Sequence, residues 1–313
     1  MIREQFIEKM QAFTSSCGLE FHIIFNTGAI KFARLKEDVA EKLKIQFLNE
    51  LSYLFLNYDS GYSLRSIQEI DETLGNVFYY FDNQNLFDNL KFIVEFSEQE
   101  STTDFSFSED SFDGINGFII KLTNANSSIY LYKKHYPVNY LQRASVLRIF
   151  KSNDKLEELQ HDILNIDKSF DFLLIDGEVV ITKIKTIERF FGYEDYIKQN
   201  AIQNMAMIET LAFIEDMSRL QESLAKTRIA KKLNKAMISS PVLDLIRTEK
   251  ENVLKFIGEH PTLKDLIKFN STGDKVQLSS LKSIEAFVKL LDDDYLKSEL
   301  TKMLYDSQNK DAL

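Results

Sequence analysis

The hydrophobic periodicity of this chain changes once, near residue 185, and that change limits the folds available to it. Before this point, short β-type runs predict strands over 19–25, 29–35, 77–81, 90–96, 117–122, 129–133, 145–150, 170–175 and 178–183. One helical pattern, over 36–57, interrupts them. After residue 185 the spacing is helical. We predict an α+β protein, with a mixed or antiparallel β-sheet domain carrying a helix at 1–185 and a mainly helical domain at 186–313.

Turn residues set the boundaries of these elements. Asn26 to Gly28 and the pair Asp176-Gly177 predict hairpins, because Asn, Asp and Gly tolerate the positive φ of tight turns. Ser240-Pro241 predicts a helix start, since serine caps a helix and proline suits its first position. The predicted helices cover 188–220 with a basic continuation to 238, then 242–258, a third opening at 260–262, and two short helices within 281–305. The polar stretch 97–113 predicts an exposed loop or edge hairpin.

Charge is distributed unevenly along the chain. The first 120 residues carry twenty Asp and Glu against nine Lys and Arg, whereas the rest carry 28 against 29. Two windows contain no acidic residue at all, 114–153 with six basic residues and 223–243 with five. A surface field depends on local arrangement and not on net charge, so an acidic protein with segregated basic windows is able to hold a polyanion.

The basic windows supply the candidate DNA-binding residues. Four cations of the second window fall along one broad face of a predicted helix, and tyrosines accompany the cations of the first, as suits stacking on bases. No recognition-helix or zinc-finger pattern is present, so binding would be largely independent of DNA sequence. The alternative is that these charges solvate a face or pair with acidic residues. The candidates are Lys133, Lys134, Arg143, Arg148, Lys151, Lys226, Arg228, Lys231, Lys232 and Lys235.

Catalytic motifs are missing from the sequence. It has no Walker-type phosphate loop, no dinucleotide-binding glycine motif and no nucleophile elbow, and its four histidines are far apart. We therefore expect no enzymatic activity, no cofactor and no metal site. One alternative is a Mg²⁺-dependent nuclease using Asp171, Asp176, Glu178 and Lys183. The spacing opposes it, because Glu178 and Lys183 face opposite sides of a regular strand.

The chain lacks the segments that direct a protein into or through a membrane. Its start has no uninterrupted apolar stretch, and no later segment reaches the roughly 18 apolar residues that span a bilayer. A single cysteine, Cys17, excludes an intrachain disulfide, and we expect its thiol to be buried or idle. We predict a cytoplasmic protein that does not insert into membranes and reaches the inner face of one only through a partner.

Three segments resemble a known family. They are the hairpin over 170–181, the run from Ile187 to Phe191 that enters a long helix, and the run from Ile238 to Leu243. Together with the general layout, these segments resemble the KwaB family of the Kiwa anti-phage defence system. The resemblance implies a dimeric cytosolic DNA-binding subunit that acts beside a small membrane protein, KwaA, and restrains phage DNA replication or transcription. It implies no catalytic residues.

These observations lead to one expected function and two alternatives. We expect a homodimeric defence protein that binds DNA without sequence specificity and acts with a membrane protein of the KwaA type. The apolar stripe from Phe191 to Met217 would either form the dimer interface or be buried within one subunit. The alternatives are the nuclease described above and a scaffold that is recruited to a membrane protein without binding DNA.

Overall fold

The computed structural model describes ten segments of the chain: residues 3–13, 16–56, 62–70, 77–81, 86–99, 101–136, 149–151, 156–158, 164–297 and 304–306. The chain forms two compact units. The first comprises Met1–Leu64 and Phe78–Ile187, and the second comprises Arg65–Val77 and Glu188–Leu313. The segment Arg65–Val77 therefore clusters with the second unit although it lies early in the chain.

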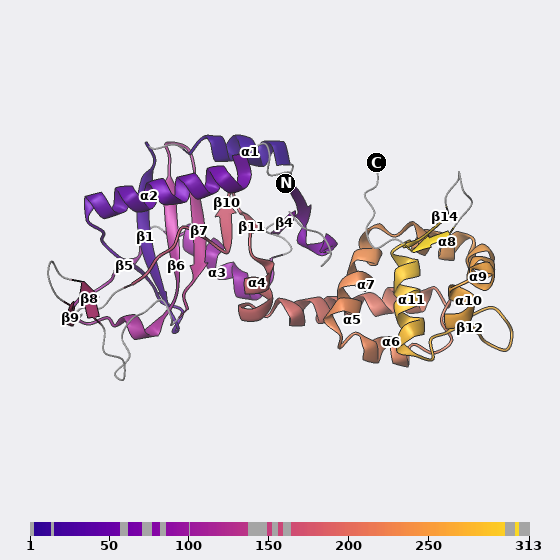
Figure 1. Ribbon diagram of the computed structural model, residues 1–313. Coiled ribbons are helices and arrows are strands. Elements are labelled where there is room, and N and C mark those ends of the chain that lie inside the picture. Colours follow the sequence, from indigo (N-terminus) through magenta and orange to yellow (C-terminus); the bar gives the residue numbers. More distant parts are fainter. Residues whose placement is uncertain are drawn as a thin grey trace. The chain divides into compact units, whose positions relative to one another are not determined.

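A nine-stranded sheet forms the frame of the first unit, in the order β3-β4-β11-β10-β7-β6-β1-β2-β5 (Figure 1). From β4 to β2 neighbouring strands pair antiparallel, whereas β2 and β5 pair parallel. This mixed sheet, followed by a mostly helical region, confirms the predicted α+β class. The strands are β1 (Gly18–Phe25), β2 (Ile30–Phe32), β3 (Ser63–Ser66), β4 (Val77–Phe81), β5 (Thr103–Asp104), β6 (Ile115–Thr123), β7 (Ser128–Lys134), β10 (Phe172–Ile175) and β11 (Glu178–Ile181).

Both predicted hairpin turns are confirmed. Gly28, with φ of 86°, lies between the antiparallel strands β1 and β2. Asp176 and Gly177, with φ of 48° and 80°, join β10 to β11, and Ile175 pairs directly with Glu178. Two consecutive positive φ values define the tight turn whose twist matches that of the flanking strands.

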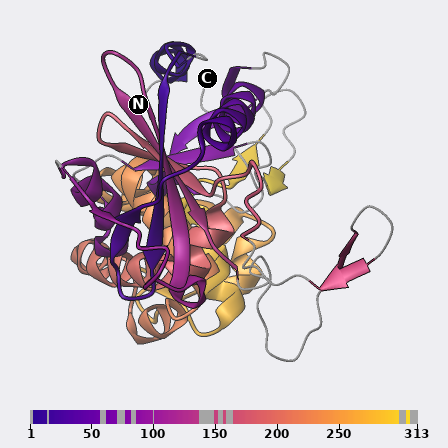
Figure 2. The same cartoon turned by 90° about the vertical axis from the view of Figure 1, so that its left-hand side faces the viewer.

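Helices cover both faces of this sheet. On one face, Phe6 of α1 (Arg3–Gln11) and Phe47 of α2 (Glu37–Leu51) join a buried cluster with Phe118 of β6. On the other face, α3 (Asp88–Ser97) packs aromatic rings against β1 and β7. Figure 2 shows α2 and α3 on opposite sides of the sheet. The sheet is therefore buried on both faces, and its central strands are apolar on both.

Two sequence predictions of strand and helix are wrong. The segment 90–96 is part of the helix α3 and not a strand, because Leu90, Ile93 and Phe96 are buried at helical spacing. After α11 (Leu281–Leu291) the chain forms a hairpin of β14 (Tyr295–Lys297) and β15 (Leu304–Asp306) where a second short helix was predicted. The predicted strand 145–150 lies mostly outside the described residues, apart from its end in β8 (Ile149–Lys151).

The second unit consists of packed helices, and the single long helix predicted over 188–238 is divided into shorter ones. Gly192, with φ of 70°, interrupts the chain between α4 and α5, and Ala212, with φ of 46°, lies just after α5. Ser240 caps α8 at the predicted start, where its side chain accepts a hydrogen bond from the Leu243 backbone. The helices are α5 (Tyr193–Thr210), α6 (Ser218–Ser223), α7 (Thr227–Ser239), α8 (Pro241–Thr248), α9 (Lys250–Glu259) and α10 (Leu263–Leu266), and α4 (Ile184–Phe190) spans the boundary between the two units.

Several short elements complete the chain. The 3-10 helix Ile67–Glu69 belongs to the second unit, and the π-helical turn Ser52–Leu56 and the 3-10 helix Phe112–Gly114 belong to the first. Two further ribbons pair outside the nine-stranded sheet, β8 with β9 (Leu156–Glu158) and β12 (Lys268–Phe269) with β13 (Val276–Gln277).

Candidate nucleic-acid interface

Helix α7 carries most of the second basic window and is amphipathic. Ile229, Ala230, Leu233 and Ala236 are buried, and they recur at the spacing that places apolar side chains on one face of a helix. The basic residues occupy the remaining positions. Helices α5 and α11 both pack against α7. Acidic side chains of α4, of α11 and of the residues that follow α11 pair with several of these cations.

The central lysine of the window is buried. Lys231 is 4% exposed, and its Nζ lies 2.5 Å from Oε1 of Glu188 on α4. A charge at this depth needs a partner, because desolvation of an unpaired ammonium is costly. Lys231 therefore neutralises an acidic side chain of its own unit and is not placed to contact a nucleic acid.

Two more lysines neutralise the acidic residues that follow α11. Lys232 Nζ lies 2.8 Å from Oδ2 of Asp294, and Lys235 Nζ lies 3.1 Å from Oδ2 of Asp292. Burial raises the pKa of the Asp292 carboxyl above its ordinary value, although Lys235 opposes this shift. The two aspartate side chains are 8% and 2% exposed. These contacts hold the end of α11 against α7, and they neutralise the charge of both lysines.

The N-terminal end of α7 remains exposed. Arg228 pairs with Glu285 of α11, yet its side chain is 59% exposed, and Lys226 is exposed without an ion-pair partner among the described residues. Because Arg228 meets Glu285 near the start of each helix and Lys235 meets Asp292 further along, α7 and α11 run parallel. Their N-termini, the positive ends of the two helix dipoles, therefore lie at the same end of the unit.

Two cations that the sequence reasoning missed join this end. Arg219 of α6 donates a hydrogen bond of 2.8 Å to the Ser279 carbonyl, just before α11 begins, and Lys282 lies in the first turn of α11. Both side chains are exposed. Neither lies in an acid-free window, so only the folded structure brings them to the others. We call Arg219, Lys226, Arg228 and Lys282 the cationic edge.

The first basic window is largely paired within the first unit where the structure describes it. Lys133 is 5% exposed, with Nζ 2.5 Å from Oδ1 of Asp167 and 2.8 Å from the Ser169 hydroxyl. Lys134 is half-buried and contacts Asn116, and burial lowers the pKa of its ammonium. Arg143 and Arg148 lie outside the described residues, as does the side chain of Lys151 on β8.

The hairpin considered for metal-dependent cleavage does not gather its carboxylates. Asp171 precedes β10 and is buried, accepting a 2.7 Å hydrogen bond from the Lys134 backbone, whereas Asp176 follows β10 and pairs with Lys9 at 2.8 Å. Five strand steps of about 3.3 Å place the Cα atoms of the two aspartates about 16 Å apart, at opposite ends of β10. Lys183 lies near Asp171, at 3.5 Å, and not near the turn that holds Glu178. Within the described segments, no group of three or more His, Cys, Asp or Glu side chains is placed to hold a metal ion.

Cys17 takes no part in a site of this kind. Its side chain is buried, and burial raises the pKa of the thiol, so the reactive thiolate is disfavoured. This agrees with the prediction of a buried cysteine.

Fold and site together define a two-unit α+β protein. Its charged clusters are intrachain ion pairs and one exposed cationic edge, and its described parts hold no group of His, Cys, Asp and Glu placed for a metal ion. The family described as "Kiwa protein KwaB-like" matches residues 112–301. The chain is 26% identical to the Kiwa protein KwaB of Escherichia coli O55:H7 (strain RM12579 / EPEC) over 296 residues, 93% of each chain. The chain belongs to the KwaB-like family of Kiwa proteins, as the resemblance predicted, and is an anti-phage defence protein.

No solved structure matches the chain. None of the helices in the described part of the chain combines the length and apolar character needed to cross a lipid bilayer.

Proposed function

We propose that this protein binds the phosphate backbone of DNA without reading its sequence, and that it does so through the cationic edge. Four exposed cations gather where two parallel helices present their N-termini, and both the side-chain charges and the helix dipoles favour an anion there. Lys226 and Lys282 are cations at helix starts, where the dipole disfavours them, so they are not explained by helix stability. This clustering of exposed cations is the main support for phosphate binding at the cationic edge.

The proposed contact set is narrower than the basic windows. Intrachain ion pairs neutralise four lysines of these windows: Lys133, Lys231, Lys232 and Lys235. Lys134 is half-buried beside Asn116 and is a weak candidate. We propose a second region of contact with the DNA backbone, formed by Arg143, Arg148 and Lys151.

In defence, the protein would act with a membrane protein of the KwaA type to block phage DNA replication or transcription. This part of the proposal rests on membership of the family, and the cytoplasmic location and the homodimer belong to it as well. The stripe members Ala201, Met205 and Ile208 are buried within the unit, so a dimer interface on α5 would use exposed apolar side chains such as Ile202 and Met207.

Fluorescence anisotropy with duplexes of unrelated sequence tests the proposal. We expect equal affinity for all duplexes, and at least tenfold weaker binding when Arg219, Lys226, Arg228 and Lys282 are replaced together by alanine. The matched control replaces Lys36, Lys42, Lys91 and Lys255, four other exposed lysines, and removes the same charge. Binding that both variants weaken equally would contradict the cationic edge. No binding by the native protein at low salt would contradict DNA binding itself and favour the scaffold alternative.

A further inference from the structure

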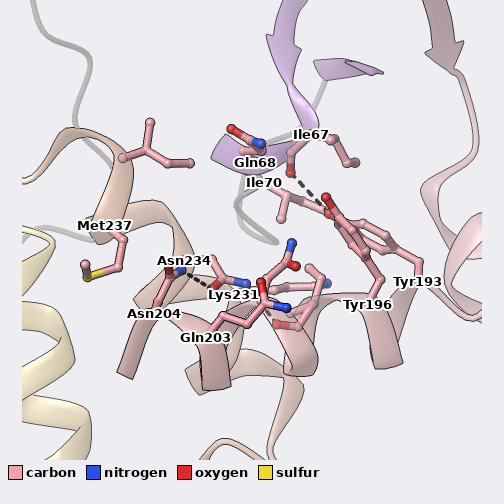
Figure 3. A pocket seen from close by; sticks show the side chains of 13 residues that line it. Ile67, Gln68, Ile70, Tyr193, Tyr196, Gln203, Asn204, Lys231, Asn234 and Met237 are labelled. Atoms are coloured by element: carbon pink, nitrogen blue, oxygen red, sulfur yellow. Dashed lines mark hydrogen bonds between the residues drawn. The ribbon is translucent and has the colours of Figure 1, made fainter. Parts of the chain in front are cut away.

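A pocket in the second unit has a lining unlike that of the cationic edge. It lies among the 3-10 helix Ile67–Glu69, α5 and α7, and its volume is about 200 Å³ (Figure 3). Five carboxamide side chains line it: Gln68, Asn200, Gln203, Asn204 and Asn234. Such a concentration of amides in one small pocket is not required by packing, because each amide buried without a partner costs free energy.

Part of this amide set is fixed in orientation. Asn234 Nδ2 donates to the Ile197 carbonyl at 2.9 Å, and its Oδ1 accepts a 2.9 Å hydrogen bond from Asn204 Nδ2. Gln68 and Asn200 are half-buried, and their side chains have no hydrogen-bond partner among the described residues. The pocket therefore offers unused donors and acceptors beside a pair that is already held in place.

Two tyrosines form the opposite wall. The rings of Tyr193 and Tyr196 are stacked, with centroids 6.1 Å apart and planes at 24°. The Tyr193 hydroxyl donates to the Ile67 carbonyl at 3.1 Å, which anchors the buried ring. Figure 3 shows Gln68 above the cavity, with the tyrosines on one side and Asn204 and Asn234 on the other.

The pocket's lining side chains that the structure describes carry almost no net charge. None of the thirteen described side chains that line it belongs to Asp or Glu, and its one cation, Lys231, is paired with Glu188. A free cation or a bare phosphate would therefore find little attraction. The cavity is smaller than the roughly 300 Å³ at which pockets for drug-sized ligands begin. A ligand that fits is small, flat, uncharged and rich in both donors and acceptors.

We propose that this pocket binds a single nucleobase. Asn and Gln amides carry a donor and an acceptor side by side and match the edges of bases, while tyrosine rings stack on their faces. The base would come from a free nucleotide or from an unpaired nucleic-acid strand. The pocket is distinct from the cationic edge, so base binding does not depend on the proposed duplex binding.

Isothermal titration with AMP, GMP, CMP and UMP tests the inference, with ribose 5-phosphate as the probe that lacks a base. We expect at least one nucleotide to bind and ribose 5-phosphate not to bind. Asn200→Ala should weaken binding about tenfold, whereas Gln221→Ala, an exposed amide on α6, should leave it unchanged. Tyr196→Leu should also weaken nucleotide binding about tenfold. Tyr196→Phe keeps the aromatic face, so its affinity for the nucleotide should stay within about twofold of the native value.

Competition with short single-stranded oligonucleotides identifies the source of the base. Displacement of the bound nucleotide assigns the pocket to an unpaired strand, and failure to displace it assigns the pocket to a free nucleotide. The inference is overturned if no nucleotide binds at millimolar concentration, if ribose 5-phosphate binds equally well, or if folded Asn200→Ala binds like the native protein. The variant of the cationic edge should still bind the nucleotide, which separates this test from that of duplex binding.

Discussion

Lys231 Nζ lies 2.5 Å from Glu188 Oε1, and this ion pair lies in the middle of the most basic stretch of the second unit. The lysine side chain is 5% exposed and the glutamate side chain 22%. A residue that the sequence places on a solvent-facing cationic stripe is therefore part of the interior that joins α7 to α4.

Replacing Lys231 by alanine should destabilise the fold. The change leaves the Glu188 carboxylate partly buried without its cation, and we expect the free energy of unfolding to fall by about 2 kcal/mol. Urea denaturation measures it. The control is Lys255→Ala, which removes an exposed 3.9 Å pair with Glu259 and should cost less than about 0.5 kcal/mol. Equal losses for the two variants would refute the structural role of Lys231.

Stability of the first unit should fall in acid partly through Asp167. Burial opposes ionisation of this carboxyl, but hydrogen bonds from Lys133 and Ser169 outweigh burial and lower its pKa from 3.8 to about 2. A depressed pKa stabilises the folded state above pH 3.8, and this contribution is lost as the pH falls towards 2. Because the Asp167 side chain is 63% exposed, we expect its ionisation to contribute only about 1 kcal/mol to the free energy of unfolding.

Urea titrations at several pH values check this dependence by comparing the native protein with Asp167→Asn. The variant should be less stable near neutral pH, and the difference should shrink as the pH drops below 4. A constant difference across this range would count against the pairing of Asp167 with Lys133.

Two glycines should respond to alanine with opposite signs. Gly177 has φ of 80° in the β10–β11 turn, so Gly177→Ala forces a side chain into the left-handed region and should cost about 1–2 kcal/mol. Gly258 lies within α9, and a Cβ there would meet Phe269 no closer than 3.6 Å, an ordinary contact. Gly258→Ala should therefore stabilise the protein by about 0.5–1 kcal/mol. Thermal denaturation of the two variants measures both changes in stability. A stabilising effect of Gly177→Ala would contradict the turn geometry.

Local signals in the sequence predict the parts of the fold that local chemistry determines. The turns at Gly28 and Asp176-Gly177 and the cap at Ser240 are set by a few adjacent residues, and the structure confirms them. The run 90–96 was misread because short apolar segments fit either a strand or a helix, and the choice is made by packing against Tyr130 and Tyr132.

The candidate site depended on contacts that no local window contains. Lys231 and Glu188 are 43 residues apart, Lys235 and Asp292 are 57 apart, and Lys232 and Asp294 are 62 apart. A window without acidic residues therefore says nothing about acids that the fold brings to it. The same long-range packing adds Arg219 and Lys282 to the exposed cations, and neither stood out in the sequence.

The salt dependence of duplex binding tests whether the cationic edge contacts DNA phosphates. Four phosphates neutralised by the cationic edge contribute about −3.6 to the slope of log affinity against log salt, at about −0.9 per phosphate. The variant lacking Arg219, Lys226, Arg228 and Lys282 should have a slope shallower than the native one by about 3.6, and the matched variant lacking four other lysines should keep the native slope. If the variant of the cationic edge kept the full native slope, the cationic edge would not contact phosphates, and the contact would lie in the region of Arg143, Arg148 and Lys151 alone.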